Sequence, residues 1–196
     1  KYLFRHDKVN VYLFIDDLSL SFNTTDRINI IKIIIPPDKF PTVTLHRYKY
    51  FTAASHLIDT YYVFYSDVDM KFVSDLGWEI LPTDISLVAT IHPGFYRGGG
   101  SWCTDERSNA YTPLENRRKY YAGGFNGGKT EGFMTMAKIL SELITDDENK
   151  GVMAEWHDEG FLNMWLGIHK CKELSPSYCY PESWIIPFRR KLLALN

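Results

Sequence analysis

Two short acidic motifs carry the strongest signs of chemistry in this sequence of 196 residues. The first is Asp67-Val68-Asp69, which closely follows an aromatic and β-branched run at residues 61–65. In an extended chain, residues i and i+2 point to the same side, roughly 6.6 Å apart. Two carboxylates so placed can share one hard divalent cation, which also binds oxygens of a substrate diphosphate. A solvated acidic turn would give the same pattern, because isolated D-x-D sequences are common.

The second motif is Trp156-His157-Asp158-Glu159, at the start of a helical pattern over residues 159–169. Acidic residues at a helix start need no function, because Asp158 can cap the helix and Glu159 can complement its dipole. A buried glutamate beside a sugar carbon can instead act as a nucleophile or stabilise positive charge. The residues alone leave both interpretations open.

Glycines and a short aromatic motif supply further candidates. Gly123 and Gly124, with a second pair at 127–128, would let a ligand approach the backbone closely, although a bulge or tight turn also explains them. Residues 92–96 (HPGFY) follow a predicted strand and offer a polar donor between aromatic walls. An ordinary Pro-Gly turn is the alternative for that segment.

The elements that must position these motifs alternate between strand and helix patterns. Strands are predicted at residues 9–15, 28–35, 61–65 and 87–91, helices at 44–58, 130–145 and 159–169, a strand with a glycine turn at 120–128, and a long loop at 93–116. This alternation predicts an α/β fold with a mostly parallel sheet in one domain, residues 1–196. Ligands bind such sheets at the carboxyl ends of strands, where Asp67 lies.

Composition excludes several other classes of protein. A hydrophobic fraction of 45% excludes a disordered chain, and a net charge of -2 gives no sign of nucleic-acid binding. Aromatic residues make up 15%, which suits a sugar cleft and equally suits a tyrosine-rich core. Three cysteines without zinc-site spacing indicate reduced thiols in a cytosolic setting. No apolar run reaches transmembrane length, so no membrane anchor is visible in this chain.

Taken together, the motifs resemble those of the family 6 glycosyltransferases. That family includes the histo-blood-group A and B transferases, the α-1,3-galactosyltransferase, and bacterial and phage relatives, and this chain is most similar to the bacterial and phage-like branch. The matching segments are TLHR (44–47), DVDMKF (67–72), HPGFY (92–96), TDER (104–107), YYAGGFNGG (120–128), WHDE with LN (156–163) and LSPSY (174–178). Their order and spacing carry the resemblance from about residue 11 to residue 187. It implies the type A glycosyltransferase fold, a Rossmann-like α/β domain.

The resemblance also implies an activity and its ligands. The family transfers galactose or N-acetylgalactosamine from a UDP-sugar to the 3-hydroxyl of an acceptor galactose, with retention of α configuration. The implied partners are a UDP-sugar donor and a galactose-containing glycan acceptor, fucosylated or not. The implied cofactor is Mn²⁺, or Mg²⁺, held by Asp67 and Asp69 against the diphosphate.

Residue roles follow from the same resemblance. The donor side comprises Arg47, Asp67, Asp69, Ala122, Gly123, Gly124, His157 and Asp158. The acceptor side comprises His92, Thr104, Trp156 and Glu159. Glu159 matches the catalytic glutamate, as nucleophile or as stabiliser of a cation. The small Ala122 and Gly124 occupy the positions that choose between donors and favour N-acetylgalactosamine.

The chain departs from the family pattern at its start. The family begins with a strand and turn that stack on uracil, and nothing before Lys1 supplies them, so the domain is expected to lack its first nucleotide-binding strand. A degenerate, non-catalytic sugar-binding relative is the alternative function. A glycoside hydrolase is the weakest, because Glu159 lacks a convincing second acid partner. The expected location is cytoplasmic for a bacterial or phage protein and the Golgi lumen for an animal relative.

Overall fold

A four-stranded sheet is the centre of the computed structural model, which describes residues 2–195. Its strands are β3 (Tyr62–Ser66), β6 (Tyr121–Lys129), β5 (Leu87–Ile91) and β7 (Cys171–Leu174), in that spatial order. The predicted α/β class is confirmed, but the expectation of a mostly parallel sheet is wrong here. Strand β6 runs antiparallel to both neighbours, and only β5 and β7 are parallel in this sheet. Lys1 and Asn196, the ends of the expected domain, lie outside the described residues.

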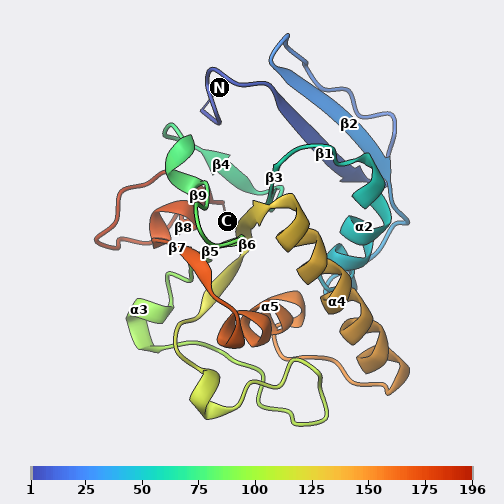
Figure 1. Ribbon diagram of the computed structural model, residues 1–196, viewed down its shortest axis with the longest axis vertical. Helices are drawn as coiled ribbons and strands as arrows, with labels where there is room; N and C mark the ends of the chain where they lie inside the picture. The colour runs from blue at the N-terminus through green and yellow to red at the C-terminus, as the bar shows by residue number, and fades with distance from the viewer. Residues whose placement is uncertain (1, 196) are drawn as a thin grey trace.

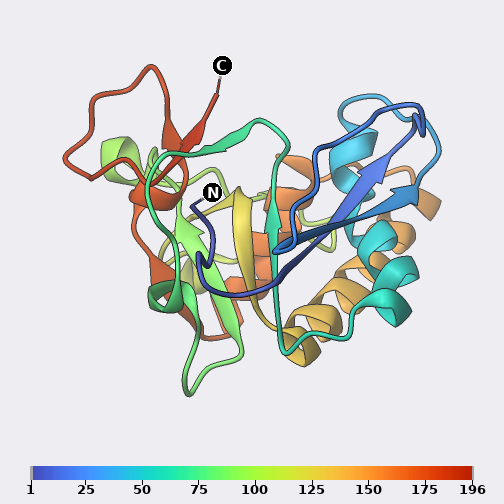
Figure 2. The same cartoon turned by 90° about the horizontal axis from the view of Figure 1, so that it is seen from above.

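Helices cover one face of the central sheet and a smaller sheet covers the other (Figure 1, Figure 2). The helices are α2 (Arg47–Ala54), α4 (Thr130–Asn149) and α5 (His157–Ile168), and the smaller sheet is β4 (Met70–Phe72), β9 (Leu192–Ala194) and β8 (Tyr180–Pro181). Strand β5 is buried on both faces, as expected for a central strand. Ala89 and Ile91 pack toward the helices, whereas Val88 packs toward the smaller sheet.

Two further strands lie beside the central sheet, next to α2 (Figure 1). Strands β1 (Val9–Ile15) and β2 (Ile28–Ile34) pair in parallel, where the sequence predicts strands. Phe14 joins them to the main core, since its ring centroid lies 5.6 Å from that of Phe51 in α2. The β-branched runs therefore form the predicted strands, in a sheet separate from the central one.

The helices differ from the predicted ranges at their ends. The single helix expected at residues 44–58 is divided into α1 (Thr42–Leu45), α2 and a 3-10 turn, η1 (Ser55–Leu57). Helix α4 does not end at residue 145 but continues through the acidic stretch to Asn149. The long loop contains α3 (Phe95–Gly98) and η3 (Leu114–Asn116), and the other short turns are η2 (Trp78–Ile80) and η4 (Pro176–Tyr178).

The glycine-rich segment forms a strand and not the expected turn. Strand β6 pairs with β5 in two registers, because Ala89 faces Asn126 whereas the next residue, Thr90, faces Ala122. Residues 123–125 are therefore bulged out of the ladder between β5 and β6. The second glycine pair is needed for close strand contact, since a Cβ on Gly127 would lie 2.3 Å from the carbonyl oxygen of Val63.

Membrane-spanning helices and disulfide bonds are both absent from the described part of the chain. Between residues 2 and 195, no helix has both the length and the apolar character needed to cross a membrane. The three cysteines, Cys103, Cys171 and Cys179, are free. The second observation agrees with the predicted reduced thiols.

We predict that Gly127→Ala destabilises the fold, because the added methyl group would meet backbone atoms of β3 that cannot rotate away. The expected loss in free energy of unfolding is about 3 kcal/mol, measured by urea denaturation. Gly98→Ala is the matched control, since a Cβ there meets nothing within 4 Å. Equal stability of the two variants would contradict the strand packing described above.

Candidate active site

Arg47 is the buried cation at the centre of the candidate site. It begins α2, and its guanidinium lies 3.2 Å from a carboxylate oxygen of Asp67 and 3.2 Å from one of Asp158. It also donates to the carbonyl of Gly123 at 3.3 Å and stacks over the ring of Tyr65. Burial opposes its charge, but the carboxylates outweigh that cost and the pKa of Arg47 is raised. Arg47 thus connects groups from three separate elements.

Asp67 follows strand β3 and begins a turn, so the extended geometry predicted for its motif is wrong. The amide of Met70 donates to the carbonyl of Asp67 at 3.2 Å, which closes a turn over residues 67–70. The Tyr65 hydroxyl donates to the Asp67 carboxylate, and the Asp67 amide donates to the carbonyl of Gly124 at 3.0 Å. Asp69 follows on the exposed side of the same turn.

The bulge glycines let carboxylates approach β6 from both faces. A Cβ on Gly123 would lie 3.1 Å from a carboxylate oxygen of Asp158 and 3.5 Å from one of Glu159. A Cβ on Gly124 would lie 2.9 Å from a carboxylate oxygen of Asp67. The two glycines thus lie between the acidic residues of α5 and the acidic turn after β3, and Arg47 bridges Asp158 to Asp67.

Glu159 is fixed by the backbone of the bulge. Its carboxylate accepts a hydrogen bond from the amide of Gly123 at 2.7 Å. Burial raises the pKa of Glu159, against the opposing effects of the Gly123 amide, the Tyr120 hydroxyl and Arg47. Asn163 lies one turn later in α5 and makes two hydrogen bonds to the backbone of Tyr121. Its side-chain amide donates to the Tyr121 carbonyl at 2.8 Å, and its side-chain oxygen accepts from the Tyr121 amide at 2.8 Å. These bonds hold the first turn of α5 against β6.

Asp158 is the most buried carboxylate of the cluster, with 6% of its surface exposed. Burial raises its pKa to about 6, although Arg47 acts in the opposite direction. The nearby charges of Glu159 and Asp67 also raise the pKa of Asp158. The site therefore contains more negative charge than Arg47 can offset.

The backbone at the start of α5 is unusual. Trp156 and His157 both adopt positive φ values, 57° and 51°, which are uncommon outside glycine. Trp156 is 60% exposed, and the ring of His157 meets that of Phe40 edge to face at 5.3 Å. The Nδ1 atom of His157 is buried and has no hydrogen-bond partner in the described structure. Such strain is often found at functional sites.

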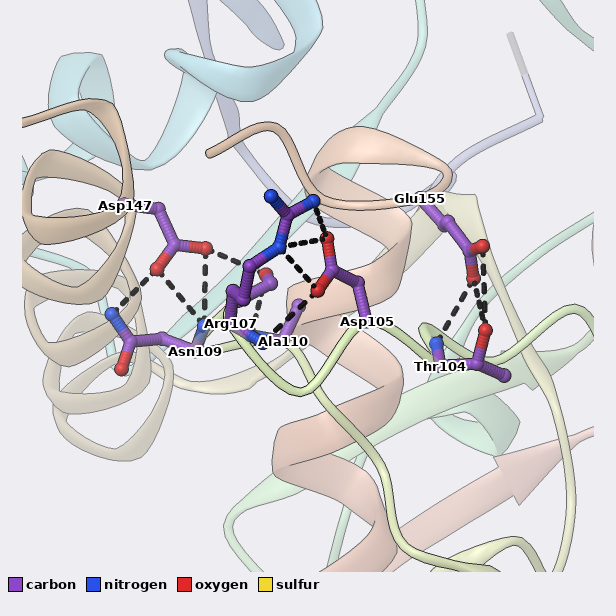
Figure 3. A network of polar contacts seen from close by, with 8 residues as sticks. Thr104, Asp105, Arg107, Asn109, Ala110, Asp147 and Glu155 are labelled. Carbon is purple, nitrogen blue, oxygen red and sulfur yellow. Dashed lines mark hydrogen bonds and ion pairs between the residues drawn. The ribbon is translucent and has the colours of Figure 1, made fainter. Parts of the chain in front are cut away.

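His92 and Thr104 lie on the loop that follows β5. His92 Nδ1 accepts a hydrogen bond from the Gly94 amide at 3.0 Å, and burial lowers the pKa of His92, which favours the neutral ring. Its ring contacts that of Tyr120, with 5.6 Å between the ring centroids. Thr104 is exposed and binds Glu155 through both its amide and its hydroxyl (Figure 3).

The structure brings together many of the predicted site residues, but not all of them. One cluster, joined by direct contacts, contains Arg47, Asp67, Gly123, Gly124, Asp158 and Glu159. Asp69, His157 and Trp156 adjoin this cluster along the chain, and Thr104 is joined to it through Glu155. Ala122 differs, since it is 2% exposed and packs in the core beneath the sheet.

The donor set at the acidic turn suits a hard cation. Among residues 2–195, no group of three or more His, Cys, Asp or Glu side chains is arranged to hold a metal ion. Asp67 and Asp69 supply two carboxylates on one turn. Magnesium and manganese accept such a partial set, because substrate phosphates and waters complete their coordination. The side chains therefore fit a cation that binds together with a diphosphate.

Several residues of the site were not found by sequence reasoning. Tyr65 binds both Arg47 and Asp67, and Asn163 fixes the start of α5. Glu155 was passed over because a carboxylate one position before an acidic motif carries no signal of its own. Asn163 lies four residues after Glu159, a helical spacing that could have identified it as a partner on the same face.

Comparisons with known proteins agree on one family. The model of "Glycosyltransferase family 6" matches residues 1–195. The Histo-blood group ABO system transferase 1 of Rattus norvegicus is 38% identical over 153 residues, covering 74% of this chain and 42% of the rat protein. The O-antigen biosynthesis glycosyltransferase WbnI of Escherichia coli is 29% identical over 177 residues, covering 88% of this chain and 74% of the bacterial protein. The Globoside alpha-1,3-N-acetylgalactosaminyltransferase 1 of Gallus gallus is 36% identical over 138 residues, covering 65% and 39%.

The alignments differ in how much of each relative they include. This chain spans 42% and 44% of the two rat ABO transferases that it matches, which is less than half of each. It spans 74% of the bacterial protein.

We predict that Arg47→Met destabilises the protein more at pH 8 than at pH 5. The pKa of Asp158 is already raised to about 6 from 3.8, and loss of Arg47 would raise it further. Above about pH 4 the folded variant keeps a proton that the unfolded chain has lost, so its stability falls as pH rises toward its own raised pKa. Because the pKa of Asp158 in the unaltered protein is already about 6, the loss caused by the substitution grows mainly above that pH. We expect a loss of about 3 kcal/mol at pH 8, measured by urea denaturation.

The control is the same substitution in an Asp158→Asn background. Without that titrating carboxyl, the effect of Arg47→Met should vary much less between the two pH values. An equal loss at pH 5 and pH 8 in the protein with native Asp158 would contradict the assigned ion pair.

Proposed function

Because the chain belongs to glycosyltransferase family 6, we propose that it transfers N-acetylgalactosamine or galactose from a UDP-sugar to a galactose-containing acceptor. The bond formed joins the sugar C1 to the acceptor 3-hydroxyl with retention of α configuration. The observation that carries the proposal is the convergence of Asp67 and Glu159 on opposite faces of the glycine bulge. That arrangement suits a ligand with a diphosphate at one end and a sugar at the other.

The donor side of the proposed site is formed by the acidic turn and by Arg47. Asp67 and Asp69 would hold Mn²⁺ or Mg²⁺, which would offset the charge of the diphosphate and of the departing UDP. Arg47 and Asp158 would contact the donor sugar, because both lie against the Gly123 side of the bulge. The ion pairs of Arg47 keep these groups oriented before the donor binds.

Glu159 would act on the reacting carbon. When the bond from C1 to the phosphate oxygen breaks, positive charge develops on the sugar, and the Glu159 carboxylate stabilises it. The acceptor hydroxyl then bonds to C1, and its proton passes to the phosphate oxygen that leaves. We favour this ion-pair route over a glycosyl ester on Glu159. The reason is that the leaving phosphate oxygen can itself take the acceptor proton, while the Gly123 amide keeps the Glu159 carboxylate in place for either route.

We further propose that N-acetylgalactosamine is the preferred donor sugar. Gly124, on the Asp67 side of the bulge, presents no side chain that would narrow the donor site, whereas Ala122 packs in the core and adds no such room. A direct competition between UDP-N-acetylgalactosamine and UDP-galactose tests this choice, and a preference for galactose overturns it. Gly124→Ala is a poor probe of donor size, because its methyl group would come within 2.9 Å of the Asp67 carboxylate.

We predict that Asp69→Asn weakens cation binding while the fold stays intact. Asp69 is exposed on its turn, and one hard anionic ligand would be lost. The Mn²⁺ concentration that gives half-maximal transfer should rise at least about tenfold. The Mn²⁺ dissociation constant in the presence of UDP, measured by electron paramagnetic resonance, should rise by a similar factor. Asp84→Asn, at another exposed loop carboxylate, should change neither value. Full activity of the unaltered protein in excess chelator would refute the metal assignment.

We predict that Glu159→Gln lowers turnover about 100-fold or more, with donor affinity within about twofold of the unaltered protein. The amide oxygen of Gln can still accept from Gly123, so the geometry is kept while the charge is lost. The measurements are UDP release with a β-galactoside acceptor and donor binding by calorimetry, in the full-length protein.

The matched control is Glu131→Gln, which removes a carboxylate from the first turn of α4. It should leave turnover unchanged. Near-normal turnover in Glu159→Gln would mean that Glu159 is only a helix-start carboxylate. Formation of a β-glycosyl azide by Glu159→Ala in azide would instead identify Glu159 as a nucleophile.

A further inference from the structure

Two carboxylates anchor the long loop between α3 and η3 to the rest of the protein (Figure 3). Asp147, buried in α4, accepts from the Ser108 hydroxyl at 2.6 Å and from the Asn109 amide at 2.9 Å. Glu155, at the start of the turn before α5, accepts from Thr104. The first contact lies deep in the structure, whereas the second lies at the surface beside Trp156.

The contact between Glu155 and Thr104 involves both polar groups of the threonine. The Thr104 amide lies 2.9 Å from one carboxylate oxygen of Glu155, and the Thr104 hydroxyl lies 3.2 Å from that oxygen and 3.4 Å from the other. Cys103, the preceding residue, is fully buried, and its carbonyl accepts from the amide of Thr112 at 3.0 Å. Thr104 is therefore fixed on both sides.

The backbone of Glu155 is held as firmly as its side chain. A Cβ on Gly160 would lie 2.4 Å from the carbonyl oxygen of Glu155, so helix α5 packs directly against it. The amide of His157 closes the turn on the carbonyl of Ala154 at 3.1 Å. Glu155 thus connects the loop to the strained pair at Trp156 and His157.

The same contact determines how the Thr104 hydroxyl can act. An ionised carboxylate only accepts hydrogen bonds, so the Thr104 hydroxyl must donate its hydrogen to Glu155. The remaining lone pairs of that hydroxyl can then accept, but not donate, a hydrogen bond. A sugar hydroxyl that meets Thr104 must therefore be the donor.

We propose that Glu155 is a positioning residue for the acceptor sugar. It holds Thr104 as a hydrogen-bond acceptor and keeps it at a fixed distance from Trp156, whose exposed ring can cover a sugar face. The carboxylate of Glu155 binds Thr104, whereas Asp158 binds Arg47 and Glu159 binds the Gly123 amide at the bulge. This role rests on the proposed transferase function.

The test compares acceptor and donor kinetics for Glu155→Ala, Glu155→Gln and a matched control. Glu155→Ala should raise the acceptor KM about tenfold, since one hydrogen-bonded contact orients the loop. The donor KM, and donor hydrolysis without acceptor, should stay within about twofold. The acceptor KM of Glu155→Gln should lie between those of the unaltered protein and Glu155→Ala, because the Gln amide oxygen can still accept one hydrogen bond. Asp105→Asn breaks only the local pair with Arg107 and should leave the acceptor KM unchanged.

Two more measurements separate positioning from a general loss of structure. Amide hydrogen exchange at Thr104 should be faster in Glu155→Ala, whereas exchange at Asn109, which Asp147 holds, should not change. In a Thr104→Val background, Glu155→Ala should raise the acceptor KM far less than it does alone.

The outcomes distinguish this inference from the proposed function. Transfer by the unaltered protein, with an unchanged acceptor KM in Glu155→Ala, overturns the inference alone. Equal changes in donor and acceptor KM also overturn it. Absence of UDP release from the unaltered protein with any β-galactoside overturns the proposed function and this inference with it.

Discussion

The bulge at residues 123–125 is the constraint on which the candidate site depends. It interrupts the pairing of β6 with β5, yet its polar groups are satisfied: Asn126 donates to the carbonyl of Gly123, and Thr90 donates to that of Phe125. The glycine amide that the bulge exposes is the one that binds Glu159. Side chains at Gly123 or Gly124 would occupy the space between the acidic groups, so the residue type and the backbone irregularity are needed together.

The electrostatics of the cluster follow from this close approach. Arg47 faces Asp67, Asp158 and Glu159, and one guanidinium cannot offset three carboxylates. Burial is the main cause that raises the pKa of Asp158 to about 6, and the charges of Glu159 and Asp67 raise it further against the effect of Arg47. A divalent cation at Asp67 and Asp69, as proposed above, would remove part of the excess negative charge. The resting charge of the site is therefore suited to a cation and a diphosphate arriving together.

The sequence predicted which elements exist more reliably than how they meet. The strands at 9–15 and 87–91 are confirmed because β-branched periodicity is a local property. The glycine turn was wrong because pairing on both edges of β6 extends a segment that would otherwise bend. Helix α4 runs past its predicted end because Asp147 finds partners from a distant loop. The predicted site residues converge, but only coordinates could reveal that Ala122 faces the core.

The motif at 156–159 has features of both interpretations that the sequence left open. Asp158 and Glu159 lie in the first turn of α5, near the positive end of the helix dipole, as expected for Glu159. The expectation that Asp158 caps the helix is wrong, because the N-cap residue is Trp156. The position of the two carboxylates in the first turn also reduces the cost of placing them beside each other and beside Asp67. The left-handed backbone at Trp156 and His157 lets the helix begin abruptly, so that both carboxylates reach the bulge within one turn. A carboxylate at a helix start is stabilised by the helix dipole, and the same position brings Glu159 to the bulge, where it could act on a substrate. The structural and the chemical interpretations are therefore compatible.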